Sequence, residues 1–129
     1  MRFTAIIITF LFLITSCGYK KAQINNRKIQ FHDTISIGTV SQSDTLTINQ
    51  SFTNHSNQEI KIFAISSECG CLTPYLEDSI IRPGQKVSMR VNYIPSVSND
   101  SGAVAKIISF RSDEDDTIKS FFIKGEVRK

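Results

Sequence analysis

The chain has 129 residues, 40% of them hydrophobic and 21% charged, with a formal net charge of only +3. Its basic residues are scattered rather than gathered in a stripe, which argues against nucleic-acid binding. The sequence contains no phosphate-binding glycine loop, no Gly-x-Ser-x-Gly nucleophile motif and no zinc-protease signature. We therefore expect a protein that is not an enzyme, unless its cysteines carry redox chemistry.

The N-terminus has the layout of a secretory signal peptide. Arg2 precedes an apolar run over residues 5–14, in which Thr9 is the only polar residue. This run is too short for a stable transmembrane helix, so a cleaved signal peptide is predicted over residues 1–16. The segment Ile14-Thr15-Ser16-Cys17 resembles the lipobox of bacterial lipoproteins, in which the cysteine thiol is lipidated and becomes the first mature residue. The alternative is an ordinary signal peptide that leaves Cys17 as a free thiol.

Residues 17–27 are predicted to be the lipidated cysteine and a flexible tether. The resemblance implies a diacylglycerol and an amide-linked acyl chain such as palmitate on Cys17, and several chains make attachment effectively permanent. About 10 extended residues reach roughly 33 Å, enough to hold a domain clear of the lipid headgroups. Gly18 follows the cysteine where an aspartate would retain a lipoprotein in the inner membrane. We therefore expect an outer-membrane lipoprotein that faces the periplasm.

Alternation of apolar and polar residues predicts β-strands throughout residues 28–129. The predicted strands cover residues 29–37, 46–53, 60–65, 87–93, 104–110 and 121–127. In the first of them the apolar residues, from Ile29 to Ile37, share one parity. In the third, apolar residues occupy both parities, so this strand is predicted to be covered on both faces. No segment shows a helical period with capping residues.

Turn-forming residues separate these strands. Arg82-Pro83-Gly84-Gln85 has proline and glycine at the two central positions of a type II turn. Polar loops are predicted at 54–57, 95–102 and 112–116, so a strand begins about every 10 to 15 residues. This spacing predicts one all-β domain over residues 28–129, an Ig-like antiparallel β-sandwich of about seven strands.

Several motifs along this domain resemble one bacterial family. The motifs, in order, are Ser67-Glu68-Cys69-Gly70-Cys71, Ile81-Arg82-Pro83-Gly84, Val91-Asn92-Tyr93 and Ile123-Lys124-Gly125-Glu126-Val127. They are similar to those of the family called domain of unknown function fifteen seventy-three (DUF1573), whose members are often lipoproteins. That family is similar in turn to the Hydin-type Ig-like domains. The resemblance implies an Ig-like sandwich and no settled activity. The chain departs from the family pattern at Ser56 or Asn57, where the family has a turn glycine, and at Leu72, which intervenes before Thr73-Pro74.

Cys69 and Cys71, two residues apart, are the candidate functional pair. Four interpretations are open: small buried residues at a strand-to-loop corner, a redox pair that exchanges with partner thiols, a Cu(I) site of two thiolates, or an intermolecular disulfide. A bond within the pair would close a very small ring and be labile or oxidising rather than structural. Glu68 disfavours a thiolate at Cys69, whereas Arg82 or Lys61 would favour one if the fold brought either near.

No other group of residues predicts a catalytic or metal site. Zinc would need about four ligands, and only His32 and His55 are available to join the cysteines. The acidic run Asp113-Glu114-Asp115-Asp116 is typical of a solvated turn and lacks the spacing and glycine of an EF-hand calcium loop. Beyond the covalent lipid we therefore expect no cofactor, with Cu(I) at Cys69 and Cys71 as the alternative.

Together these observations predict a lipid-anchored Ig-like domain of the cell envelope that acts as a non-catalytic binding or structural module. Its sheet edges and end loops are the expected contact surfaces for an envelope partner protein. The alternative is a thiol-redox or Cu(I)-handling lipoprotein that uses Cys69 and Cys71.

Overall fold

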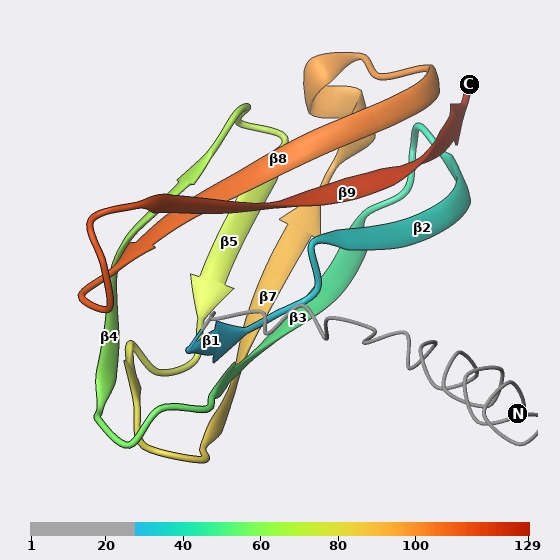
Figure 1. Ribbon diagram of the computed structural model, residues 1–129. Coiled ribbons are helices and arrows are strands. Elements are labelled where there is room, and N and C mark those ends of the chain that lie inside the picture. The colour runs from blue at the N-terminus through green and yellow to red at the C-terminus, as the bar shows by residue number, and fades with distance from the viewer. Residues whose placement is uncertain (1–27) are drawn as a thin grey trace, which may run out of the picture.

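The computed structural model describes residues 28–129, which form two β-sheets packed face to face (Figure 1). In chain order the elements are β1 (Ile29–Gln30), β2 (Thr34–Ser41), β3 (Leu46–Asn54), β4 (Ile60–Ser67), β5 (Leu72–Leu76), β6 (Ile80–Ile81), β7 (Lys86–Tyr93), the 3-10 helix η2 (Pro95–Ser98), β8 (Gly102–Ser112) and β9 (Ile118–Arg128). Between residues 28 and 129 no helix has the length and apolarity needed to cross a membrane. The predicted signal peptide, Cys17 and the predicted tether lie outside the described residues.

The sheets have four and five strands. The first has the order β1-β3-β7-β5 and the second the order β2-β9-β8-β4-β6. Neighbouring strands are antiparallel except β2 and β9, which run parallel. Because β1 and β6 have two residues each, seven longer strands carry the sandwich. The predicted Ig-like β-sandwich is therefore confirmed.

The core lies between the sheets and follows the predicted alternation. Along β7, Val87, Met89, Val91 and Tyr93 are all buried. An aromatic cluster joins the two layers. The ring centroid of Phe110 lies 5.0 Å from that of Phe52 and 5.1 Å from that of Phe31, and both pairs pack edge to face. The fully buried part of the core is Ile29, Phe52, Ile81, Met89, Val91, Tyr93, Ile108, Phe121 and Ile123. Burying these side chains removes apolar surface from water, which is the main favourable contribution to folding.

The prediction of a single first strand over 29–37 was wrong, because the chain changes sheets in the middle of that run. β1 pairs with β3 in one sheet, whereas β2 pairs with β9 in the other. The buried amide of Gln50 holds the crossing: its Nε2 donates to His32 O at 2.6 Å, and its Oε1 accepts from His32 N at 3.3 Å. His32 therefore lies between two strands, not on the first strand.

The prediction that the strand at 60–65 is covered on both faces was also wrong. A bulge between Ile62 and Ala64 shifts the register of β4 against β8, and Ile65 then lies opposite the buried Phe110. Phe63 follows the buried Ile62 and faces outward, where it is 54% exposed. The bulge adds one residue to β4, so Ala64 also faces outward and Ile65 comes to the inner face.

Glycines allow the close approach of β2 to β9. A Cβ on Gly125 would lie 2.6 Å from Gly38 O and would also collide with the Ile37 side chain. Gly38 has a φ of +66° where the register of β2 shifts, a backbone conformation that favours glycine. The predicted type II turn is confirmed as well, since Gly84 has a φ of +74° and Gln85 N donates to Arg82 O at 2.9 Å.

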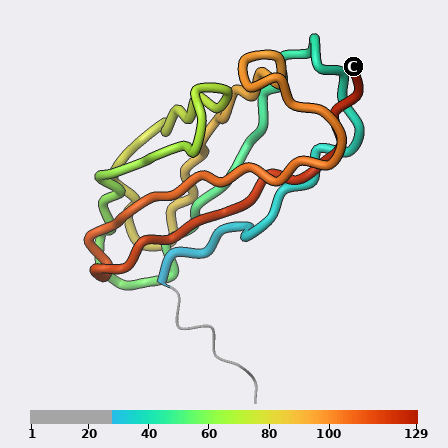
Figure 2. The backbone as a smooth tube through the Cα atoms, turned by 90° about the horizontal axis from the view of Figure 1, so that it is seen from above, coloured from blue at the N-terminus to red at the C-terminus, as the bar shows by residue number. Residues whose placement is uncertain are grey.

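The two ends of the sandwich carry different features. The described chain starts beside the acidic turn, where Lys28 N donates to Glu114 Oε1 at 2.8 Å. The C-terminus, the loop containing η2 and the cysteine turn lie at the opposite end, as Figures 1 and 2 show. The start of the described chain and the cysteine turn therefore lie at opposite ends of the sandwich.

Candidate functional site

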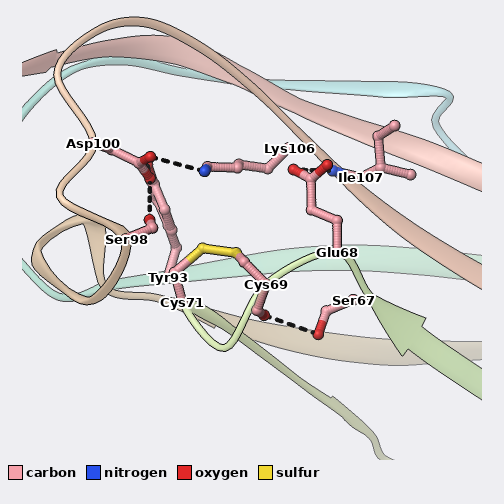
Figure 3. The surroundings of a disulfide bond; sticks show 9 residues. All are labelled: Ser67, Glu68, Cys69, Cys71, Tyr93, Ser98, Asp100, Lys106 and Ile107. Carbon is pink, nitrogen blue, oxygen red and sulfur yellow. Dashed lines mark hydrogen bonds and ion pairs between the residues drawn. A yellow bond between two sulfur atoms is a disulfide. The ribbon is translucent and has the colours of Figure 1, made fainter.

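Cys69 and Cys71 lie in the turn between β4 and β5, where the chain crosses from one sheet to the other. The structure joins them in a disulfide with a Cα to Cα distance of 5.2 Å (Figure 3). The two residues differ in exposure: Cys71 is 1% exposed and belongs to the core, whereas Cys69 is only partly buried. Gly70 between them is exposed, and a Cβ built on it would meet no atom within 4 Å.

Hydrogen bonds to backbone carbonyls hold this turn, and none of them involves a sulfur atom. The carbonyl of Cys69 accepts from Ser67 Oγ at 3.1 Å and from Leu72 N at 3.3 Å. The carbonyl of Cys71 accepts from Ile94 N at 2.9 Å, which ties the turn to the end of β7. The positions of both cysteines are therefore set by β4, β5 and β7.

A polar cluster centred on Asp100 fixes the neighbouring loop, which contains η2. Its carboxylate accepts from Tyr93 Oη at 2.6 Å, Ser98 Oγ at 2.7 Å and Lys106 Nζ at 2.8 Å (Figure 3). Burial alone would raise the pKa of Asp100, but the hydrogen bond from Lys106, followed by those from Tyr93 and Ser98, outweighs it and lowers the pKa. Burial and the bond to this carboxylate raise the pKa of Tyr93.

Neither of the two cations considered from the sequence, Lys61 and Arg82, lies near the cysteines. Lys61 pairs with Ile80 at the start of β4, and Arg82 follows β6, so both lie at the other end of the sandwich from the cysteines. Glu68 is next to Cys69, but its Oε1 accepts from Ile107 N at 3.1 Å. The nearby cation is Lys106, which precedes Ile107 on β8, and the carboxylate of Asp100, 2.8 Å away, neutralises its charge.

The cluster of Asp100, Tyr93 and Lys106 was missed by sequence reasoning. Asp100 lies in a polar loop, and Lys106 occupies an ordinary position of a predicted strand. β7 and β8 belong to different sheets, and the loop between them carries Asp100, so only the packing of the two sheets brings the three side chains together. No local pattern of residues signals this. The cluster positions the loop and supplies no free acid or base, because each charged group is already paired.

The other metal ligands considered from the sequence do not join the cysteines. His55 follows β3 at the opposite end of the sandwich, where its Nε2 lies 2.6 Å from Gln30 Oε1. Among the described residues, no three His, Cys, Asp or Glu side chains converge as a metal site.

The acidic run is bound to the domain itself. Asp113 Oδ1 accepts from Lys61 N at 2.8 Å, and Asp115 Oδ1 accepts from Lys119 Nζ at 2.8 Å. The Lys119 ammonium also lies 3.5 Å from Glu114 Oε2, which accepts no hydrogen bond. These contacts identify the run as a structural turn that closes the β8–β9 hairpin.

A second candidate surface is the outer face of the five-stranded sheet, which we call the apolar face. The bulge at Phe63 and the register of β8 and β9 turn one set of apolar side chains outward: Phe63, Ala64, Ile107, Ile118 and Phe122. Ile118 is 68% exposed and Phe122 is 36% exposed. The apolar face thus leaves large hydrophobic side chains in contact with solvent.

Small and cationic side chains complete the apolar face. A row of serines, Ser66, Ser109 and Ser120, crosses it between Ile118 and Phe122, and a shallow pocket of about 120 Å³ lies along this row. Two cations stack on its rings: the Arg111 guanidinium lies 5.7 Å from the Phe63 centroid, and Lys124 Nζ lies 5.3 Å from that of Phe122.

The outer face of the four-stranded sheet is different in character. It presents polar residues along all its longer strands: Thr47, Asn49, Ser51, Ser88, Arg90, Asn92 and Thr73. Tyr75 is its one large exposed hydrophobic side chain among the described residues, and the Arg90 guanidinium lies 5.2 Å from its ring centroid. The hydrophobic exposure of the sandwich is therefore concentrated on one face.

Comparison with solved structures agrees with the fold. A protein of unknown function from Porphyromonas gingivalis W83 is similar, with 17% identity and a TM-score of 0.68 over 76% of this chain and 46% of that one. Part of the secreted serine protease VesC from Vibrio cholerae is also similar, with 11% identity and a TM-score of 0.60 over 77% of this chain and 23% of that one. The ASH / PapD-like domain of human CEP192 (PapD-like domain 7) has 13% identity and a TM-score of 0.56 over 79% of this chain and 86% of that one. At such low sequence identity, the structural similarity establishes a common fold only. The chain spans less than half the length of the first two proteins.

No curated protein matches the chain. The family described as protein of unknown function (DUF1573) matches residues 28–127, which is nearly the whole sandwich including the cysteine turn and the close approach at Gly125. The chain therefore belongs to the DUF1573 family.

Proposed function

We propose that this chain is a lipid-anchored module of the bacterial outer membrane that faces the periplasm and binds an envelope partner protein through its apolar face without catalysis. The lipobox-like segment ending at Cys17 supports the anchor, as set out from the sequence. The concentration of exposed hydrophobic side chains on one face supports the binding role, and this is the observation that carries the proposal.

The sheet edges are less suitable for a partner than the sequence suggested. The outer strands of the two sheets are β1, β5, β2 and β6. β1 and β6 have two residues each, β5 contains Pro74, and β2 is interrupted by the register shift at Gly38. Short strands, prolines and bulges protect edges against added strands. A flat sheet face is therefore the better contact surface.

The apolar face can supply useful binding energy. Phe63 is 54% exposed, and a phenylalanine has about 200 Å² of surface, so a partner could cover roughly 100 Å² of it. At about 25 cal/mol per Å², this burial contributes roughly 2.5 kcal/mol. The face mixes exposed apolar side chains with a row of serines and with cations stacked on Phe63 and Phe122. Protein interfaces are mixed in the same way, with aromatic residues and arginine enriched.

Site-specific photocrosslinking tests the binding role in the anchored protein. A photoreactive phenylalanine analogue at Ile118 should give an adduct with another envelope protein, and Phe63→Ser should abolish it. The matched control is the same analogue at Tyr75, an aromatic with a stacked arginine on the opposite face, which should give none. Equal adducts at both positions, or none at Ile118, would contradict the proposal. An adduct with a second copy of the chain or with lipid would also contradict it.

The anchor is tested separately. We expect the wild-type chain to remain with membranes after a high-salt wash and Cys17→Ser to be released. If the Cys17→Ser protein stays with the membrane under the same wash, the lipid anchor is wrong, whatever the apolar face binds.

The disulfide favours a second candidate function, thiol–disulfide exchange. Copper(I) binding requires two thiolates, whereas the structure holds Cys69 and Cys71 in a bond to each other. Thiol labelling of membranes across a series of dithiothreitol ratios should show the pair passing reversibly between disulfide and dithiol in the folded protein. A pair that stays fully reduced in cells, or one that is reduced only on unfolding, would refute this function.

A further inference from the structure

The two cysteines of the pair differ in exposure. Cys71 is 1% exposed and packs in the core, whereas Cys69 is only partly buried. Exchange proceeds by attack of a thiolate on one sulfur of a disulfide, and access decides which sulfur is attacked. We therefore expect a thiolate arriving from solvent to attack Cys69 rather than the buried Cys71.

From this difference we infer that Cys69 forms the mixed disulfide with an envelope protein that carries a pair of cysteines, and that Cys71 is the internal sulfur that leaves and returns. This inference rests on the second candidate function. It adds the order of the steps and the class of substrate, a protein dithiol.

The exchange balances without another reactant. The first thiolate of the partner attacks Cys69 Sγ, the bond to Cys71 breaks, and Cys71 departs as a thiolate that takes up the proton lost by the partner thiol. The second thiolate of the partner then attacks the partner's first sulfur, which is bonded to Cys69 in the mixed disulfide. Cys69 leaves as a thiolate and is protonated. The pair in this chain is reduced by two electrons, and the partner dithiol is oxidised to a disulfide. In the reverse direction, reduced Cys69 attacks a partner disulfide.

The turn is built to survive this cycle. The hydrogen bonds from Ser67 and Leu72 to Cys69 O, and from Ile94 to Cys71 O, do not involve sulfur, so they hold the pair in place when the bond opens. The bond encloses a single residue, Gly70, and the stabilisation that a disulfide provides by restricting the unfolded chain grows with loop length. Opening it therefore leaves the sandwich folded.

Gly70 provides space for the substrate. Its backbone is outside the left-handed region, and a Cβ on it would meet no atom within 4 Å. Neither backbone conformation nor packing within the described domain requires glycine here. A side chain at this position would instead project into open space beside Cys69, where a partner backbone must approach.

Mapping the mixed disulfide tests the inference in the full-length, membrane-extracted protein. Reduced glutathione is the probe: after a brief reaction, acid quenching and alkylation, peptide mass spectrometry should find glutathione on Cys69 and not on Cys71. With glutathione disulfide, the single variant Cys71→Ser should react at least tenfold faster than Cys69→Ser. In urea the two rates should become equal, which would assign the difference to the fold. Because a serine in the core can disturb folding, the rate of Cys71→Ala is measured alongside that of Cys71→Ser. The mapping of glutathione on the wild-type protein depends on no substitution.

The possible outcomes distinguish a wrong assignment of Cys69 from a failure of the thiol–disulfide exchange function itself. If the wild-type pair exchanges but glutathione maps to Cys71, or the two variants react equally when folded, the inference is wrong and the redox function stands. If the folded wild-type protein does not exchange with glutathione or dithiothreitol at all, both are wrong. In cells, Cys71→Ser should accumulate a reductant-sensitive adduct with a protein, and Gly70→Val should reduce that adduct while leaving the reaction with glutathione unchanged. An adduct on Cys69→Ser instead would overturn the inference.

Discussion

Replacing Tyr93 with phenylalanine isolates one hydrogen bond of the cluster that fixes the loop beside the disulfide. The ring of Tyr93 is fully buried, and its hydroxyl donates to the Asp100 carboxylate at 2.6 Å. Phenylalanine keeps the ring, so no cavity forms. A hydrogen bond to a charged group contributes about 1.5–3 kcal/mol, so we expect Tyr93→Phe to lower the free energy of unfolding by about 2 kcal/mol. For a domain of this size that corresponds to a fall in Tm of roughly 8–16 °C.

The pH dependence gives this prediction a second, independent part. Burial, followed by the bond to Asp100, raises the pKa of Tyr93 above its ordinary value of 10.0. A raised pKa stabilises the fold fully below pH 10, and the stabilisation is lost as the pH rises above 10, because the unfolded chain then releases the proton first. Between pH 10 and pH 11 the wild-type protein should lose stability on this account, and Tyr93→Phe should lose none of it.

Urea unfolding of both proteins at pH 7 and pH 11 measures both parts. The stability difference between wild type and Tyr93→Phe should be largest at pH 7 and should narrow at pH 11. Ser98→Ala is the control, since it removes an exposed donor to the same carboxylate and should cost much less. Equal stability of wild type and Tyr93→Phe at pH 7, or a difference that does not narrow at pH 11, would refute the role assigned to this hydrogen bond.

Three further predictions concern the fold. Asn54→Ala removes a buried amide that donates to Gln58 O and Ile81 O at 2.7 and 2.8 Å; calorimetry should show a loss of about 3 kcal/mol, and a loss below about 1 kcal/mol would contradict this account. Gly125→Ala should cost about 1–3 kcal/mol in urea unfolding, because the new Cβ collides with the backbone of β2; unchanged stability would show that the strands can separate freely. The hydrogen bond from Lys119, followed by those from Thr117, lowers the pKa of Asp115 to about 2, so its contribution is present above pH 4 and lost as the pH falls toward 2. Asp115→Asn should flatten that acid dependence in low salt, and an unchanged acid profile would speak against the pairing.

Much of the fold follows from local patterns. Clean alternation along β7 and the Pro83-Gly84 turn predict a strand and a type II turn, because side-chain period and a positive φ are properties of a few adjacent residues. The division of the first strand was not predictable in this way. Ile29 and Ile37 share one parity, and the change of sheet between them depends on a distant side chain, Gln50, that binds the His32 backbone.

The candidate surfaces show the same limit. Phe63 and Ile65 look equally buried in sequence, and only the bulge in β4 decides that Ile65 enters the core and Phe63 faces solvent. The spacing of Cys69 and Cys71 made a small disulfide conceivable, but their unequal burial depends on where β4 crosses to β5. Side-chain exposure at bends and crossings is set by tertiary packing, which no local pattern contains.

The affinity of the captured partner for the apolar face is the most direct test of the proposed function. Once photocrosslinking at Ile118 has identified that partner, its Kd should be measured for the wild-type chain, Phe63→Ser and Tyr75→Ser, each shown to be folded by its Tm. Losing the roughly 2.5 kcal/mol estimated for Phe63 should weaken binding about 60-fold, whereas Tyr75→Ser should leave the Kd within about twofold. Equal affinities for the wild type and Phe63→Ser, or an equal loss in both variants, would contradict binding through this face.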